Sequence, residues 1–189
     1  MSNTRRMTLV AMLSAISTLL AAPFLQFSIL GIPFLKVDLT ILPILIGVFT
    51  LGLSSGYIIL AVRSVLWFII WPDGVNTYVG LPMNIVAIGV FILILWFFLR
   101  KKFTLAAYVL SGVIATLVMT VLMALLNLVY AIPVYEKFAN YPASALSLSK
   151  YVIPVVIPFN LLEGVIFTVA FGLLFAILRR NKVIKFYNA

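Results

Sequence analysis

Long hydrophobic runs separated by short charged clusters limit most strongly how this chain can fold. Five runs cover most of its 189 residues: Met7–Gln26, Leu39–Trp71, Gly80–Leu99, Phe103–Ala131 and Val152–Leu178. A transmembrane helix needs about 20 consecutive apolar residues, so each run is long enough to cross a bilayer. Only 9% of the residues are charged, against about 25% in soluble domains. The sequence therefore predicts an all-α integral membrane protein.

The second run, Leu39–Trp71, is too long for one helix, and a Gly/Ser-rich turn at residues 52–56 divides it. Charge supports two helices, because cytoplasmic loops are enriched in lysine and arginine. With two helices, one side of the membrane collects Arg5, Arg6, Arg100, Lys101, Lys102, Arg179, Arg180, Lys182 and Lys185. The other side receives Lys36, Lys137 and Lys150. We predict a six-transmembrane-helix bundle with both termini cytoplasmic.

The predicted bundle is a single multi-pass domain of the cytoplasmic membrane, spanning residues 1–189. Its spans are expected at residues 7–26, 39–53, 55–71, 80–99, 103–131 and 154–178. The longer connections, at residues 27–38, 72–79 and 132–151, then lie outside the cell. A substrate pocket is expected near this extracellular side.

Most enzymatic mechanisms lack the residues that they need in this chain. There is no cysteine and no histidine, which removes the thiolate nucleophile, the commonest proton shuttle and the commonest metal ligand. The four acidic residues, Asp38, Asp73, Glu136 and Glu163, form no pair at helical spacing for acid–base catalysis. The sequence contains no G-x-x-x-x-G-K-[ST] loop for ATP. We predict no catalytic residue, metal site or cofactor, and topology explains the basic excess without a nucleic-acid partner.

Two charged residues, Arg63 and Glu163, lie within predicted spans. A charge near the bilayer centre costs about 2.5–3.5 kcal/mol on insertion scales, so each needs a partner or a function. Both are expected roughly 8–15 Å below the external surface, at about 1.5 Å of rise per residue. Their similar depth and opposite sign predict an ion pair or a shared polar interior. The alternative is a structural interaction with no role in ligand binding.

Three asparagines, Asn84, Asn127 and Asn160, lie in the external halves of three different spans. An amide side chain both donates and accepts hydrogen bonds, which suits the imide-like edge of a heterocycle. Asn160 and Glu163 are three residues apart and share a helix face. Interhelical hydrogen bonding, worth about 0.6 kcal/mol on average, is the alternative for any single asparagine. For three at one depth beside a glutamate, we predict a binding pocket.

The loop at residues 32–40, Ile-Pro-Phe-Leu-Lys-Val-Asp-Leu-Thr, is short and carries both signs of charge. It is expected either to cap the second span through Asp38 or Thr40 or to fold over the pocket as a lid. Aromatic residues near the external interface form either a membrane belt or a stacking surface for a planar ligand: Trp67, Trp71, Tyr78, Tyr130 and Tyr135. Ala11 and Ala15 in the first span form a small-residue strip that lets another helix approach.

Several of these features together resemble the substrate-binding S components of energy-coupling factor (ECF) vitamin transporters, specifically the riboflavin-specific members. The similarity covers essentially the whole chain. Its specific parts are residues 33–38 (Pro-Phe-Leu-Lys-Val-Asp) leading to Pro43, the Gly52/Gly56 turn, Met83-Asn84 and residues 158–161 (Pro-Phe-Asn-Leu).

The resemblance implies a subunit that binds riboflavin with high affinity from outside and works with a transmembrane coupling subunit and two ATPase subunits. It also implies that Ala11 and Ala15 dock on the coupling subunit, and that the vitamin lies under the first loop, near Asn84 and Asn160. Glu163 is added from its position alone. The candidate substrate-binding residues are Lys36, Val37, Asp38, Leu39, Thr40, Tyr78, Gly80, Asn84, Ala87, Asn127, Asn160 and Glu163. The alternatives are another vitamin or flavin mononucleotide as ligand, an ion-coupled carrier, and a membrane enzyme.

Overall fold

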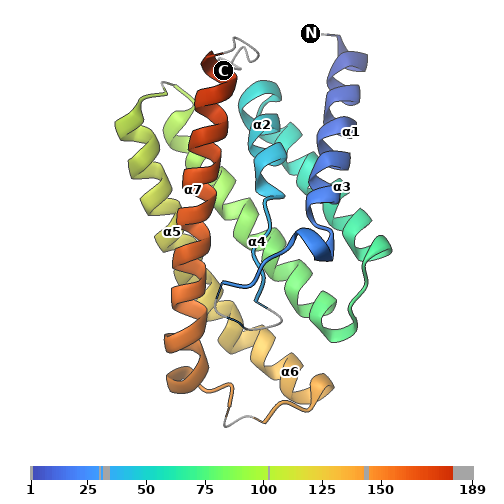
Figure 1. The fold of residues 1–189 in the computed structure, drawn as a ribbon, viewed down its shortest axis with the longest axis vertical. Coiled ribbons are helices and arrows are strands. Elements are labelled where there is room, and N and C mark those ends of the chain that lie inside the picture. The colour runs from blue at the N-terminus through green and yellow to red at the C-terminus, as the bar shows by residue number, and fades with distance from the viewer. Residues whose placement is uncertain (1, 30, 32–34, 102, 143–144, 181–189) are drawn as a thin grey trace.

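A computed structural model describes residues 2–29, 31, 35–101, 103–142 and 145–180, and this part of the chain is helical almost throughout. The α-helices are α1 (Asn3–Leu20), α2 (Ile41–Leu51), α3 (Leu53–Ile70), α4 (Gly74–Leu99), α5 (Leu105–Leu126), α6 (Ile132–Ala139) and α7 (Ile157–Arg180). Three short elements complete the order: the 3₁₀-helix η1 (Pro23–Leu25) and the π-helices η2 (Asn127–Ala131) and η3 (Leu148–Val156). Because α5, η2 and α6 are continuous, as are η3 and α7, the described residues form six helical rods (Figure 1).

The long run at residues 39–71 is two helices, as predicted. Gly52 has φ +96°, a backbone conformation that residues with a Cβ rarely adopt, and it ends α2 at Leu51. Helix α3 begins at the next residue and packs against α2. One glycine therefore makes the turn, and the rest of the predicted turn is already helical.

Four helical stretches are long and apolar enough to cross a membrane: Leu53–Ile70, Gly74–Leu99, Leu105–Ala139 and Leu148–Leu178. Helix α2 is apolar but has 11 residues. Helix α1 begins and α7 ends at the same end of the bundle (Figure 1), as an even number of crossings requires. The six membrane spans and the cytoplasmic orientation of this end stay predictions.

Two of the segments predicted as external loops, residues 72–79 and 132–151, are mostly helical. Helix α4 begins at Gly74, where φ is +49°, and the Asp73 N–H donates to the Thr77 hydroxyl at 2.6 Å across its first turn. Residues 132–139 form α6, which begins with Pro133 in its first turn, a position where proline is tolerated. Prolines and polar residues here start helices rather than interrupt them.

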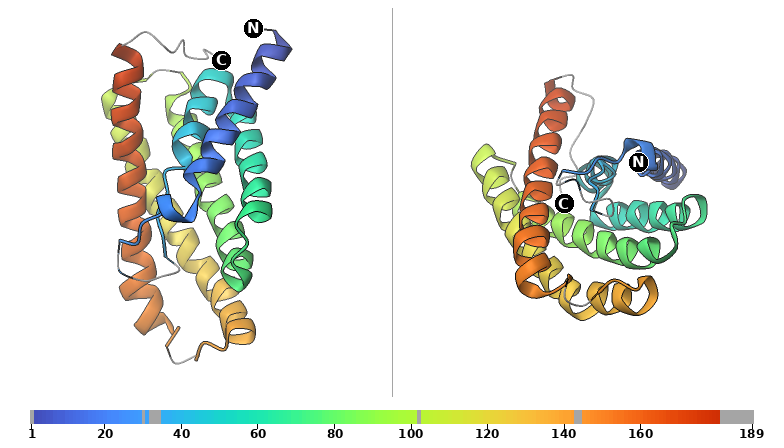
Figure 2. Two further views of the ribbon diagram at one scale, coloured as in Figure 1. Left: turned by 45° about the vertical axis from the view of Figure 1, so that its right-hand side comes forward. Right: turned by 60° about the horizontal axis from the view of Figure 1, so that its bottom comes forward.

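Helix α4 runs through the middle of the bundle, with α1, α2 and α3 on one side and α5 and α7 on the other (Figure 1). Helices α5 and α7 approach so closely at Gly164 that a Cβ there would clash with the Thr116 side chain. Small residues allow such close packing between membrane helices. Helix α6 lies at the end remote from the termini (Figure 2).

The half of the bundle near the termini is filled by aromatic rings. Phe103 stacks on Phe175 with centroids 3.9 Å apart, and Phe49 stacks on Phe171 at 5.6 Å. One turn further into the bundle, Phe91 meets Phe167 edge-to-face at 5.7 Å. This packed half leaves the opposite end as the place for a cavity.

Candidate binding site

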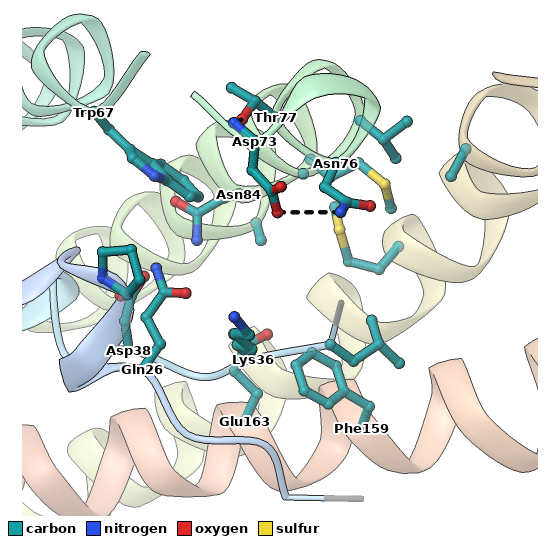
Figure 3. Close-up of a pocket in the computed structure, with 18 of the residues that line it drawn as sticks. Gln26, Lys36, Asp38, Trp67, Asp73, Asn76, Thr77, Asn84, Phe159 and Glu163 are labelled. Atoms are coloured by element: carbon teal, nitrogen blue, oxygen red, sulfur yellow. Dashed lines mark hydrogen bonds between the residues drawn. The ribbon is translucent and has the colours of Figure 1, made fainter. Parts of the chain in front are cut away.

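A cavity of about 570 Å³ opens at the end of the bundle remote from the termini. Its volume falls within the roughly 300–1,000 Å³ of small-molecule sites. Figure 3 shows Trp67 and Asn84 on one wall and Phe159 and Glu163 on the wall opposite. The segment after α1 crosses between these walls and contributes Lys36 and Asp38.

Eight of the predicted binding residues line this cavity: Lys36, Asp38, Gly80, Asn84, Ala87, Asn127, Asn160 and Glu163. They come from the first loop, α4, η2 and α7. The fold therefore brings together residues that are more than 100 positions apart in the sequence. Their contact with a ligand stays a prediction.

Three of the other predicted residues are in the first loop but do not line the cavity: Val37, Leu39 and Thr40. Val37 pairs with Phe27 through two backbone hydrogen bonds of 2.8 and 3.0 Å. Side chains alternate in extended backbone, so Val37 enters the hydrophobic core between Lys36 and Asp38. Thr40 is fully buried, and its carbonyl accepts a hydrogen bond from Ser17 at 2.8 Å.

The fourth, Tyr78, is 61% exposed and does not line the cavity. Gly80, Asn84 and Ala87 follow one another at intervals of three or four residues, which defines one face of α4. Tyr78 lies outside this face and rests against Phe68, with ring centroids 6.2 Å apart.

Asp38 combines two roles at the start of α2. Its Oδ1 accepts hydrogen bonds from the Thr40 N–H at 3.0 Å and from the Thr40 hydroxyl at 2.5 Å. These bonds hold the turn that leads into α2, but the N-cap residue Thr40 forms no side-chain capping bond, so the predicted cap of the second span is wrong. The same carboxylate lines the cavity, so the loop conformation and the cavity wall depend on one side chain.

Asn127 and Asn160 are oriented in the same way. The Asn127 amide donates to the Met123 carbonyl at 2.9 Å, and the Asn160 amide donates to the Val156 carbonyl at 2.8 Å. Each amide has two N–H groups and one oxygen, so each keeps its oxygen and one N–H for the cavity. Asn127 begins the π-helix η2, and Val156 ends the π-helix η3. Such π-helical turns are often found at functional sites.

The predicted ion pair between Arg63 and Glu163 is wrong. Arg63 is fully buried and its Nη2 donates to the Asn84 Oδ1 at 2.7 Å. Equal depth in the membrane does not fix the direction in which two helices point their side chains. Arg63 therefore lies behind the cavity wall, whereas Glu163 lies in it.

Glu163 is 7% exposed and lines the cavity. Within the described part of the chain, its carboxyl group forms no hydrogen bond or ion pair with protein. Burying an ionisable group without a partner is costly, and in membrane proteins such groups mark binding or transport pathways. The Glu163 carboxyl is therefore available to a ligand.

Residues 5–175 match the model of the family described as ECF transporter, substrate-specific component. The chain belongs to this family. A riboflavin transporter RibU of Lactococcus lactis subsp. cremoris is 47% identical over 206 residues, covering 100% of both chains. The RibU of Streptococcus thermophilus is 45% identical, covering 95% of this chain and 85% of that protein. The riboflavin transporter FmnP of Bacillus subtilis is 33% identical, covering 90% of each.

A solved structure, described as the S component of a bacterial ECF transporter, superposes with a TM-score of 0.79. Its sequence is 27% identical, and the match covers 95% of this chain and 98% of that one. This likeness confirms the predicted helical S-component fold. It also confirms that the chain is a multi-pass protein of the cytoplasmic membrane and part of a transporter, which overturns the enzyme alternative.

Several cavity residues of this S component were missed in the sequence. Asn76 and Thr77 line the cavity from the first turn of α4, where the sequence pattern predicts a loop. Their signal is the helical spacing that connects Asn76 through Gly80 to Asn84. Gln26 also lines the cavity, and its amide donates to the Ala21 carbonyl at 2.8 Å. Trp67, Trp71 and Tyr135 also line the cavity, which agrees with the alternative that some of the interfacial aromatic residues form a stacking surface.

The described residues contain no group of three or more His, Cys, Asp or Glu side chains that could hold a metal ion. The site is therefore one of amides, carboxylates, one lysine and aromatic rings. This composition suits hydrogen bonding and stacking with an organic ligand.

Proposed function

We propose that this chain binds riboflavin in the cavity and is the substrate-binding subunit of an ECF transporter. In this function it delivers the vitamin through a transmembrane coupling subunit that two ATPase subunits drive. Relatives that are 33–47% identical over most of their length bear the name riboflavin transporter. The observation that carries the proposal is the convergence of Asn84, Asn127 and Asn160 from three rods on one cavity.

The chemistry of riboflavin fits the cavity. Its flat isoalloxazine ring has an apolar dimethylbenzene edge and a pyrimidine edge on which an N–H lies between two carbonyl groups. Trp67 and Phe159 offer flat surfaces on opposite walls, and aromatic rings favour offset stacking. The ribityl hydroxyls both donate and accept hydrogen bonds. They can therefore pair with the other polar side chains of the cavity wall, which include donors and acceptors.

The orientations of the amides support this assignment further. Asn127 and Asn160 each use one N–H on the backbone and present an oxygen, which can accept from the ring N–H or a ribityl hydroxyl. Asn84 uses its oxygen on Arg63 and presents its NH₂ group, which can donate to a ring carbonyl. Donors and acceptors are thus both available along the pyrimidine edge.

The proposal is tested by titrating riboflavin with the protein purified in detergent. Isoalloxazine fluorescence is expected to fall to a one-to-one end point, because stacking on an aromatic side chain quenches it. Protein purified from cells that contain riboflavin is expected to be yellow. A colourless preparation that leaves riboflavin fluorescence unchanged would contradict the assignment.

We further propose that Ala11 and Ala15 form the contact with the coupling subunit. Both are exposed on α1, whereas Ser14, Ser17 and Thr18 face the bundle. Neither alanine lines the cavity. Ala15→Trp is expected to abolish riboflavin uptake by the assembled transporter and to leave riboflavin binding unchanged. Loss of binding in this variant would place α1 in the site instead.

A further inference from the structure

Arg63 is the most heavily buried charged side chain that the binding proposal leaves without a role. It is 0% exposed, and its Nη2 donates to the Asn84 Oδ1 at 2.7 Å. Its Nε and Nη1 are buried and have no hydrogen-bond partner among the described residues. Unpaired N–H groups of a buried cation cost considerable free energy. If the contact only held α3 against α4, a pair of apolar side chains would do so at a lower free-energy cost.

Arg63 contacts two side chains of the cavity wall, those of Asn84 and Trp67. Asn84 lines the cavity from α4, and Trp67 lines it from α3. The Arg63 guanidinium lies 5.5 Å from the centre of the Trp67 ring, within the range of a cation–π interaction. Arg63 itself does not line the cavity. It therefore supports two wall residues from behind.

The hydrogen bond also determines which end of the Asn84 amide faces the ligand. An amide flipped by rotation about its last bond exchanges a donor for an acceptor at the same point in space. Arginine has no acceptor, so only the Asn84 oxygen can pair with it. The Asn84 nitrogen is then on the cavity side, as Figure 3 shows.

We propose that Arg63 is a positioning residue that holds the Asn84 amide with its NH₂ group toward the cavity, where it donates to an acceptor atom of the ligand. This assignment rests on the proposed riboflavin site and deepens it. It makes Asn84 a hydrogen-bond donor in a cavity where Asn127 and Asn160 present oxygens. The ligand acceptor that suits it is a ring carbonyl or ring nitrogen.

The first test is a double-mutant cycle in the full-length protein, with Arg63→Met, Asn84→Ala and the double variant. Each single variant is expected to weaken riboflavin binding by roughly 5- to 100-fold. The double variant is expected to bind no more weakly than the weaker single variant, because Arg63 acts through Asn84. Additive losses would overturn the proposal, as would full affinity in Arg63→Met beside a weakened Asn84→Ala.

Ser64→Ala provides the matched control. Ser64 is the neighbouring buried residue on α3, and its hydroxyl donates within the helix to the Leu60 carbonyl at 2.7 Å. Unchanged riboflavin affinity is expected. A loss as large as that of Arg63→Met would show that any disturbance of α3 weakens the site, and would overturn a specific role for Arg63.

Asn84→Asp replaces the NH₂ group of the amide by an oxygen and keeps an oxygen as the partner of Arg63. An oxygen remains for the guanidinium, so the thermal stability of the ligand-free protein is expected to stay at or above the wild-type value. Riboflavin binding is expected to weaken at least as much as in Asn84→Ala. Wild-type affinity in this variant would overturn the proposal.

A ligand-free measurement distinguishes failure of this inference from failure of the riboflavin assignment. In ¹⁵N-labelled protein, the Asn84 side-chain amide signal is identified by its loss in Asn84→Ala. Arg63→Met is expected to shift that signal, because the charged donor on its oxygen is gone. An unshifted signal would overturn the inference whether or not riboflavin is the ligand, and a shifted signal in a protein that binds no riboflavin would support it.

Discussion

Helix α7 passes through two different environments, although the same face of the helix is turned inward along its length. Toward its start, Phe159, Asn160 and Glu163 line the cavity. Toward its end, Phe167 and Phe171 pack against aromatic rings of α2 and α4, and Phe175 packs against Phe103. From Phe159 through Glu163 to the three phenylalanines the spacing is four residues, and Asn160 lies three residues before Glu163, which keeps them all on one helix face. One stripe therefore builds a polar site at one end and a dry core at the other.

The difference between the halves shows where stability and recognition are located. The aromatic half is packed and offers no polar group to a ligand along this stripe. The cavity half contains buried polar groups, which cost free energy unless they are paired. Substitutions in the two halves should therefore separate folding from binding.

The largest effect is expected in the aromatic half. Phe171→Ala removes a fully packed ring from the stack with Phe49 and should lower the free energy of unfolding by about 3–5 kcal/mol. Thermal unfolding of the ligand-free protein in detergent measures this loss. Riboflavin affinity of the folded protein should change much less. A variant with wild-type stability and lost binding would reverse the roles assigned to the two halves.

Asn160→Ala should produce the opposite pattern in the cavity half. We expect riboflavin binding to weaken by about 1–3 kcal/mol, because a polar group of the ligand loses its partner. Thermal stability should change little, since the amide bonds its own helix backbone. Isothermal titration beside the wild-type protein measures the affinity. Equal riboflavin affinities of the variant and the wild-type protein would show that Asn160 has only a structural role.

Glu163→Gln should change selectivity more than affinity. The Glu163 carboxyl group and Asp38 line the same cavity, so a phosphate on the ligand meets acidic side chains. Glu163→Gln removes one acidic group and should improve the binding of flavin mononucleotide relative to riboflavin, by at most about 1 kcal/mol. Competition between the two flavins gives this ratio. An unchanged ratio would show that the phosphate lies away from Glu163.

The smallest effect is expected for Tyr78→Ala, on the outer face of the helix that carries Asn84. Its side chain is exposed and does not line the cavity, so riboflavin affinity should stay within about 0.5 kcal/mol of the wild-type value. The same titration measures it. A loss comparable to that of Asn160→Ala would extend the site to this face.

Sequence patterns could predict the helical membrane fold and a large part of the cavity. The turn at Gly52 was predictable because charge counting required two helices there. The position of Asn84, Asn127 and Asn160 in one cavity was predictable, because amide side chains in apolar helices cost free energy unless they are paired. Three of them at equal depth therefore indicate a shared binding site. The hydrogen-bond partner of Arg63 was not predictable, because the depth of a residue in the membrane does not determine the direction in which its side chain leaves the helix. Asn76 was missed because Pro72 and Asp73 resemble a loop, although α4 begins at the next residue, Gly74.

We infer that riboflavin lies in the cavity remote from the termini, between Trp67 and α7. The most direct measurement is an experimental structure of the riboflavin-bound protein. We expect the isoalloxazine ring within this cavity, with its pyrimidine edge within hydrogen-bond distance of Asn84 and of Asn127 or Asn160. Riboflavin bound outside this cavity, or within it but with no contact to these three amides, would contradict this placement.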